Sequence, residues 1–211
     1  MIKTVLFDLD GTLTDSGPGI MNCASLMLDH YNFPYDQALL RTFIGPPLRV
    51  RLEQLGFSPK DAEEATKIFR GQYNVTGKFE NSPYPGMIDL LKTLKAQGHR
   101  LFVATSKPEW MAEEILKKFE LDSYFDRICG ATMDTSRTEK SQVIAYLLGL
   151  TGSAENAIMV GDTKFDVIGA AAHNIPTVGV SWGYGTVEDM QNAGAVAIAN
   201  TMQELLEYLT K

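Results

Sequence analysis

The sequence predicts an α/β protein with a central parallel sheet flanked by helices and a small all-α insert after the first strand. Two observations carry this prediction. Short apolar, β-branched segments alternate with longer segments of helical period, which is typical of a parallel sheet covered by helices on both faces. Between about Asp15 and Asn81 this alternation stops, and only helical patterns occur.

Five segments have the apolar character of strands: Thr4–Leu9, Arg100–Thr105, Ala157–Gly161, Pro176–Val180 and the less regular Ala195–Ile198. The helical patterns that alternate with them cover Gly86–Gln97, Glu109–Phe119, Lys140–Leu148, Asp166–His173 and Met202–Leu209. We therefore expect residues 1–14 and 82–211 to form one Rossmann-like core.

The insert, residues 15–81, is expected to be a separate helical domain. Its predicted helices are Gly19–Tyr31, Tyr35–Phe43, Leu48–Leu55 and Pro59–Tyr73. Ser58 is a predicted N-cap, and the helix dipole favours an acidic residue such as Asp61 in the first turn. Glycine and proline at Gly17–Gly19, and proline at Pro83, mark the two ends of the insert as loops.

Composition excludes several classes of function. The chain has 211 residues, 45% of them hydrophobic, and a net charge of −7, so we expect one or two soluble domains. An acidic chain without a basic cluster is a poor ligand for nucleic acid or an anionic membrane. No apolar run is long enough for a membrane span or an export signal, which favours a cytoplasmic protein. Cys23 and Cys129 are expected to be reduced, buried thiols.

Two aspartates follow the first strand in the segment Asp8-Leu9-Asp10-Gly11-Thr12. The carboxyl end of a parallel strand is where open α/β sheets bind ligands. Two neighbouring carboxylates repel each other unless a cation joins them, and oxygen ligands suit Mg²⁺. An ordinary strand end with solvated acids explains the segment equally well when it is taken alone.

Three further elements lie at similar positions. Thr105-Ser106-Lys107 ends the second strand, and its hydroxyl and amide groups could hold a phosphate or simply cap a helix. Lys140 begins a helix. Asp162 and Asp166 lie where the third strand meets its helix, so one carboxylate could bind a metal with the second behind it.

Together, in this order, the four elements resemble the motifs of the haloacid dehalogenase superfamily of phosphatases. The resemblance covers essentially the whole chain, and the helical insert is similar to the family's α-helical cap. Further stretches, among them Phe43–Leu48 and Trp182–Gly185, are similar to the phosphoglycolate phosphatase-like group and to its 5′-nucleotidase branch.

The resemblance implies a role for each matched residue. Asp8 would be the nucleophile that forms an aspartyl-phosphate, and Asp10 the general acid and base. Mg²⁺ would be held by Asp8, the backbone carbonyl of Asp10 and Asp162, with Asp166 behind them. The phosphoryl oxygens would be bound by Thr105, Ser106 and Lys140.

The substrate implied is a small phosphate ester, with nucleoside 5′-monophosphates or 2-phosphoglycolate as the first candidates. Residues that could select it are Arg49 near the Gly45–Leu48 loop, Lys107, and Trp182, which with Tyr184 could form an aromatic edge over the site. For Arg49 a solvent-facing position is the simpler interpretation, and for Trp182 a packing role is equally compatible with the sequence. A monomer and a homodimer are both compatible with the sequence.

Four alternatives to a phosphatase are considered at this point. A mutase uses the same motifs with a different acceptor. A dehalogenase does not use the second aspartate, and a phosphonatase needs a cap lysine that nothing in the sequence marks. A non-catalytic interaction module on the same fold is disfavoured because all four motifs are present.

Overall fold

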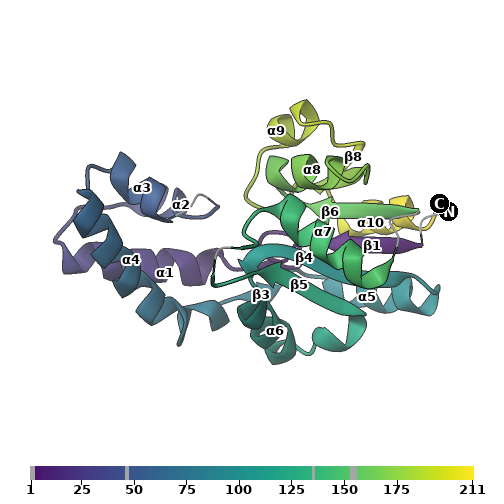
Figure 1. Ribbon diagram of the computed structural model, residues 1–211, viewed down its shortest axis with the longest axis horizontal. Coiled ribbons are helices and arrows are strands. Elements are labelled where there is room, and N and C mark those ends of the chain that lie inside the picture. Colours follow the sequence, from purple (N-terminus) through teal and green to yellow (C-terminus); the bar gives the residue numbers. More distant parts are fainter. Residues whose placement is uncertain (1–2, 46–47, 135, 153–155) are drawn as a thin grey trace. The chain divides into compact units, whose positions relative to one another are not determined.

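The structure, a computed structural model, describes residues 3–45, 48–134, 136–152 and 156–211 (Figure 1). The chain forms two compact units, Met1–Asp15 with Pro83–Lys211 and Ser16–Ser82. The first unit contains the main sheet, and the second is helical. The chain therefore leaves the sheet unit soon after its first strand and returns to complete it.

A parallel sheet forms the centre of the first unit, as the sequence predicts, and it has six strands where five were predicted. The strand order is β5-β4-β1-β6-β7-β8. Phe7 in β1 lies opposite Val103 in β4 and Val160 in β6, so these three strands end at the same edge. The strands are β1 (Thr4–Phe7), β4 (Arg100–Pro108), β5 (Arg127–Ala131), β6 (Ala157–Gly161), β7 (Thr177–Val180) and β8 (Ala197–Ala199).

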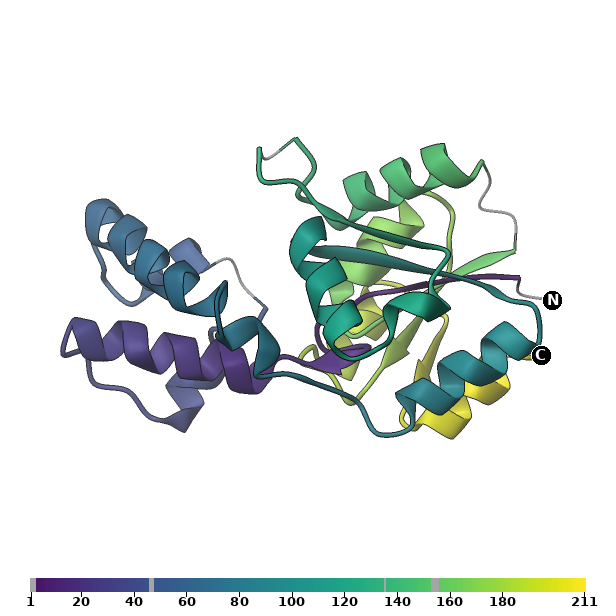
Figure 2. The ribbon, with the colours of Figure 1, turned by 90° about the horizontal axis from the view of Figure 1, so that it is seen from below.

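Helices cover the sheet in two groups. The chain returns through α5 (Met87–Ala96) and α6 (Glu109–Lys118), and the last helix, α10 (Met202–Leu209), packs beside α5 (Figure 2). On the crossovers from β5 onward, α7 (Lys140–Thr151) contacts α8 (Lys164–Ala171), which contacts α9 (Val187–Asn192). Right-handed crossovers place these two groups on opposite faces of a parallel sheet.

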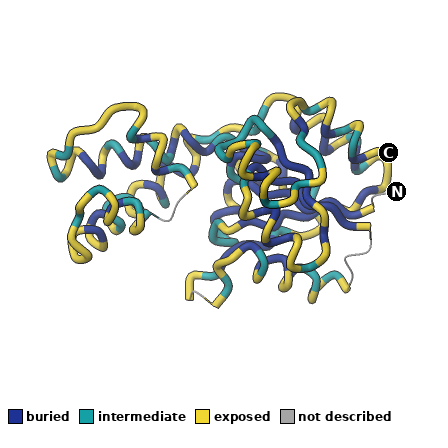
Figure 3. Tube along the Cα trace, turned by 90° about the horizontal axis from the view of Figure 1, so that it is seen from above, coloured by how far each residue is buried: buried dark blue, intermediate teal, exposed yellow. Residues whose placement is uncertain are grey.

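The core explains why these segments are strands. The residues of β1 and β6 are buried along their whole length (Figure 3). Strands buried on both faces need continuous apolar runs, which is the pattern that predicted them. The cluster beneath α7 is formed by Leu6, Phe102, Ala104, Cys129, Val143, Ile144, Leu147, Ala157, Met159, Ala170 and Ile175.

The second unit has its own core. Its helices are α1 (Gly17–His30), α2 (Gln37–Arg41), α3 (Leu48–Gln54) and α4 (Pro59–Tyr73), followed by a 3₁₀ turn at Gly77–Phe79. Ser58 caps α4, because its hydroxyl accepts a hydrogen bond from the Asp61 amide at 3.2 Å. Pro46 and Pro47, in the loop Gly45–Leu48 that the sequence analysis singled out, lie outside the described residues. The buried apolar residues are Ala24, Met27, Leu28, Leu40, Phe43, Leu52, Ala62 and Ala65.

Four short elements depart from the predicted pattern. The edge strand β5 and the helix α9 were not predicted, and neither were the two-residue strands β2 (Thr14–Asp15) and β3 (Ser82–Pro83), which pair with each other. Another 3₁₀ turn covers Asp122–Tyr124.

Cys23 and Cys129 are free and buried, as predicted. Within the described part of the chain, no helix has the length and apolar character that crossing a membrane requires.

Two helical glycines should respond in opposite ways to the same substitution. A Cβ on Gly169 in α8 would lie 2.7 Å from Cβ and Cγ of Lys140 in α7, whereas a Cβ on Gly149 in α7 would meet nothing within 4 Å. We expect Gly169→Ala to lower the free energy of unfolding by about 1–3 kcal/mol through overpacking. Gly149→Ala should raise it by about 0.5–1 kcal/mol. Urea denaturation of both variants measures this, and equal effects would show that the α7–α8 contact is not tight.

Candidate active site

Three neighbouring strands bring the predicted site residues together. Asp8 follows β1, Thr105 lies near the end of β4, and Asp162 follows β6. These strands are adjacent and parallel, so their carboxyl ends meet at one edge of the sheet. The Asp8 amide still donates to the Val160 carbonyl at 3.0 Å, which keeps Asp8 in register with β6. The main chain therefore fixes the position of the Asp8 backbone, from which the carboxylate extends.

Lys140 is the cation at the centre of this edge. Its ammonium group lies 2.7 Å from Asp8 Oδ1 and 2.7 Å from Asp166 Oδ1, and it donates to the Ala104 carbonyl at 2.9 Å. The side chain is 5% exposed. A lysine buried this deeply is rare unless it is paired, and here all three protons have an acceptor within reach. The sequence-predicted residues Asp8, Lys140 and Asp166 thus form one ion-pair network.

Asp162 is held by two hydrogen bonds. Oδ1 accepts from the Thr12 hydroxyl at 3.1 Å, and Oδ2 accepts from the Tyr184 amide at 2.8 Å. Glycines leave room for this carboxylate, since a Cβ on Gly11 or Gly183 would collide with it. Gly11 also has φ +83°, a backbone angle that favours glycine. Two segments far apart in the sequence therefore enclose the same side chain.

Asp166 has a different environment. Its Oδ2 accepts from the Thr163 amide at 3.0 Å and from the Thr163 hydroxyl at 2.8 Å, in a capping box at the start of α8. Its Oδ1 faces Lys140. Both oxygens are thus engaged by the protein. This fits a residue that orients Lys140 better than one that binds a ligand directly.

The cluster of acids could hold a cation. Carboxylate oxygens of Asp8, Asp162 and Asp166 lie within 4.8 Å of one another, and all three residues are buried. Asp10 adds a fourth carboxylate, and Lys107 and Lys140 are the ammonium groups paired with the cluster. The carboxylates thus outnumber these ammonium groups by two, which is the charge of one divalent ion. Oxygen-only ligands favour Mg²⁺ or a similar hard cation.

Burial shifts the ionisation of these groups. Burial, opposed in part by Lys140, raises the pKa of Asp8 to about 6. Burial and the nearby Asp166 and Asp8 charges raise the pKa of Asp162 to about 7. Burial alone would lower the pKa of Lys140, but Asp166 and Asp8 outweigh it and raise that pKa. The carboxylates therefore carry an unfavourable excess of negative charge when no cation is bound.

Asp10 is bound to a second lysine. Lys107 Nζ donates to Asp10 Oδ2 at 2.7 Å, and the Lys107 side chain is 6% exposed. The other oxygen, Oδ1, is buried and has no hydrogen-bond partner among the described residues. The two aspartates of the first motif thus face different cations, Lys140 for Asp8 and Lys107 for Asp10.

The remaining predicted residues have simpler surroundings. The Thr105 hydroxyl is buried and accepts from the Lys107 amide at 3.2 Å, while Ser106 is exposed. Trp182 Nε1 donates to the Thr12 carbonyl at 3.2 Å, which fixes the indole against the first motif. In the helical unit, Arg49 pairs with Glu53 at 2.9 Å and its side chain is 59% exposed.

The sequence predicted Tyr184 beside Trp182 in an aromatic edge but did not predict its contacts with two aspartates. Its amide binds Asp162, and its hydroxyl donates to Asp15 Oδ1 at 2.8 Å. Asp15 is the last residue of the sheet unit before the helical unit begins. The available signal was the Trp-Gly-Tyr-Gly segment itself, because small residues around an aromatic one indicate a close main-chain approach.

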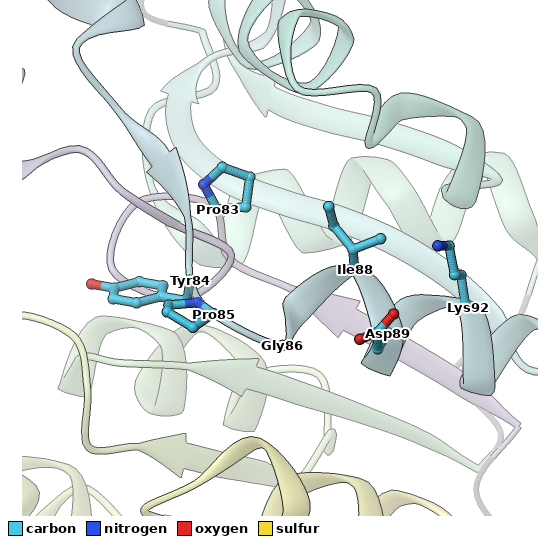
Figure 4. Close-up of a pocket in the computed structure, with 7 residues that line it drawn as sticks. All are labelled: Pro83, Tyr84, Pro85, Gly86, Ile88, Asp89 and Lys92. Carbon is cyan, nitrogen blue, oxygen red and sulfur yellow. The ribbon is translucent and has the colours of Figure 1, made fainter.

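A separate hollow lies at the start of α5. Its volume is about 470 Å³, and Figure 4 shows its lining of Pro83, Tyr84, Pro85, Gly86, Ile88, Asp89 and Lys92. It contains none of the clustered acids. Its single lysine and single aspartate give no convergent set of polar groups, so the acid cluster remains the candidate site.

Comparisons with known proteins agree with this geometry. The profile of a family described as haloacid dehalogenase-like hydrolase matches residues 5–180. The tyrosine-protein kinase PtkA of Mycobacterium tuberculosis is 43% identical over 98% of this chain and 72% of its own length. A 5′-nucleotidase of Pseudomonas aeruginosa is 39% identical over 89% of this chain and 86% of its own.

A solved structure shows the same fold. The crystal structure of a predicted phosphatase from Clostridium acetobutylicum superposes with a TM-score of 0.90 at 39% identity, covering 100% of this chain and 99% of the other. The family match, the related sequences and the solved structure agree with the acid cluster. The chain belongs to the haloacid dehalogenase-like hydrolase family and is an enzyme of its phosphatase type.

Proposed function

We propose that this enzyme is a Mg²⁺-dependent phosphomonoesterase that hydrolyses small phosphate esters through an aspartyl-phosphate on Asp8. The observation that carries the proposal is the buried ammonium group of Lys140, held between Asp8 and Asp166 where β1, β4 and β6 end. A cation at this point attracts a phosphoryl group to the carboxylate that would attack it.

Asp8 acts as the nucleophile in this proposal. One carboxylate oxygen bonds to phosphorus, while the bond from phosphorus to the ester oxygen breaks. Asp10 gives its proton to the departing alkoxide. In the second half of the reaction Asp10 takes a proton from water, the water oxygen attacks phosphorus, and the carboxylate of Asp8 leaves. Dividing the displacement in this way replaces one difficult step with two easier ones.

Lys140, the Thr105 hydroxyl and the Ser106 amide bind the phosphoryl oxygens. Thr105 and Ser106 lie on β4, the strand directly beside β1. Lys140 reaches the same edge from α7 and also donates to the Ala104 carbonyl, one residue before Thr105. These contacts hold the phosphate in line with Asp8.

The donor set fits Mg²⁺. Asp8, Asp162 and the backbone carbonyl of Asp10 would hold the ion, and Asp166 stays behind them on Lys140 and Thr163. When bound, Mg²⁺ supplies charge neutralisation between the anionic phosphate and the carboxylates. The two surplus negative charges and the raised pKa of Asp162, about 7, support a divalent occupant.

The substrates proposed are nucleoside 5′-monophosphates or 2-phosphoglycolate. The relative named 5′-nucleotidase supports the first of these. The helical unit would act as the cap that selects the leaving group, with Arg49 and the Trp182 edge as candidate contacts. A mutase of the same family is the alternative, since it differs only in the group that accepts the phosphoryl from Asp8. The relative named as a kinase makes a non-water acceptor worth testing.

The first test is phosphate release by Asp8→Asn beside the wild type. The amide cannot form the aspartyl-phosphate, so we expect activity to fall by at least about a thousandfold, as when a nucleophile is removed. The panel contains 5′-nucleotides, 2-phosphoglycolate, sugar phosphates and phosphotyrosine, each with Mg²⁺ and with EDTA.

The control is Asp122→Asn, which changes an exposed aspartate away from the cluster and should leave activity unchanged. A second arm adds ATP and a tyrosine-containing peptide, to detect transfer to an acceptor other than water. Equal, low phosphate release by wild type and Asp8→Asn on every ester would overturn the hydrolase proposal.

The second test concerns the cation and pH. Saturating Mg²⁺ at a hundredfold excess over its Kd should stabilise the fold by about 2.7 kcal/mol, a rise in Tm of roughly 5–10 °C. The rise should be smaller at pH 5 than at pH 8, because protons compete with the ion for the carboxylates. Asp162→Asn should remove it. No Mg²⁺-dependent shift at pH 8 would contradict this cation site.

Without metal, stability should change with pH in the opposite direction. The pKa of Asp162 is raised in the folded state from 3.8 to about 7, so ionising this residue favours the unfolded chain. In EDTA, wild type should therefore lose stability relative to Asp162→Asn as the pH rises from about 4 to above 7. Differential scanning calorimetry of both proteins across this range measures the gap, and a constant gap would contradict the pKa shift.

A further inference from the structure

The Lys107 ammonium group lies where a substrate-selecting lysine would be of little use. Its side chain is 6% exposed, and Nζ already donates to Asp10 Oδ2 at 2.7 Å. A lysine that recognises the far end of a substrate needs a mobile, exposed head. The sequence-based hypothesis that Lys107 selects the substrate therefore loses its simplest support.

The main chain around Lys107 is built to aim this side chain. The pairing of β4 with β5 shifts register between Ala104 and Pro108. Irregularities of this kind redirect side chains beside active sites. The Lys107 amide also donates to the Thr105 hydroxyl at 3.2 Å, which ties these two residues together within β4.

The same segment is anchored from β5. A Cβ on Gly130 would lie 2.6 Å from the Lys107 carbonyl, so only glycine allows β5 to approach this closely. The Gly130 amide donates to Glu109 Oε2 at 3.0 Å, and Arg137 binds the same oxygen at 2.8 Å. The backbone that carries Lys107 is thus fixed on both sides.

The fixed position of Lys107 determines the orientation of the Asp10 carboxylate. Its backbone is set by the turn in which the Gly11 amide donates to the Thr14 carbonyl at 2.8 Å. Its carboxylate has one oxygen bound to Lys107 and one, Oδ1, buried with no hydrogen-bond partner among the described residues. A buried unpaired oxygen is costly, and its orientation persists only if something holds the group in place.

We propose that Lys107 is a positioning residue for Asp10: the ion pair fixes Oδ2 and leaves Oδ1 available to the ester oxygen of the substrate. The assignment rests on the proposed function of Asp10 as the proton donor. Lys107 does not touch the reacting atoms. It restricts one carboxylate to the orientation in which its other oxygen can exchange a proton with the leaving group or with water.

The test compares two leaving groups in Lys107→Met, whose side chain has similar length and no charge. A 4-nitrophenyl ester releases a stable anion that needs no proton, whereas an alkyl ester releases an alkoxide that does. Single-turnover release of the phenol or alcohol reports the first half-reaction alone. We expect Lys107→Met to slow the alkyl ester by at least about tenfold, within the range of general acid catalysis, and the aryl ester by less than about threefold.

Three controls distinguish this role from others. Lys107→Arg keeps the charge and should restore part of the alkyl rate. Asp10→Asn should show the same selective loss, and adding Lys107→Met to it should cost nothing further, because both changes remove one interaction. An equal loss on both esters, or a rise in KM with unchanged rate, would assign Lys107 to phosphate or substrate binding and overturn the proposal.

A structural readout decides the question without turnover. In a crystal structure of Lys107→Met, or of Lys107→Gln if the first variant does not fold, the Asp10 carboxylate should leave its present orientation. An unchanged Asp10 would overturn the proposal. If the wild type hydrolyses neither ester, the proposed function fails, while this comparison still shows whether Lys107 positions Asp10.

Discussion

The buried ion pairs of Lys140 are the contact on which the rest of the structure depends. Asp8 comes from the end of β1 and Asp166 from α8, and neither carboxylate could be buried without the ammonium group between them. Removing one partner of such a network typically costs 3–5 kcal/mol, because a buried charge is left alone. Gly169 leaves the space in which the Lys140 stem passes α8. The pairing that arranges the site therefore also docks α7 and α8 on the sheet.

The space around Asp162 follows from a second constraint. This carboxylate is enclosed by main chain from both sides, since a Cβ on Gly11 or on Gly183 would collide with it. The Thr12 hydroxyl and the Tyr184 amide each bind one of the two oxygens, and a carboxylate oxygen has a second lone pair that can bind a cation. A preorganised carboxylate of this kind, beside a surplus of negative charge, is what the proposed cation site requires.

The sequence predicted those parts of the molecule that leave a local pattern. Continuous apolar runs identified β1, β4 and β6, and the motifs placed Asp8 and Asp162 at the ends of β1 and β6 and Lys140 at the start of a helix. The edge strand β5 was missed because Arg127–Ala131 contains one β-branched residue and a glycine and so lacks a continuous apolar run, and α9 because it has six residues. The pairing of Lys107 with Asp10 joins positions 97 apart, and that of Tyr184 with Asp15 joins positions 169 apart. Only the folded chain brings such partners together, so the periodicity of the sequence could not predict these two contacts.

The two lysines also explain how one short motif can hold two different acids. Asp8 and Asp10 are separated by a single residue, yet Asp8 faces Lys140, which it shares with Asp166, while Asp10 faces Lys107. The first pair belongs to a buried network in which Lys140 also pairs with Asp166 and donates to the Ala104 carbonyl. The second engages one oxygen and leaves the other buried and unpaired among the described residues. In the proposed reaction Lys140 holds Asp8 at the end of β1 for attack on phosphorus, whereas the buried oxygen of Asp10 gains and loses a proton. The division of labour proposed for the two aspartates thus follows from which cation each one meets.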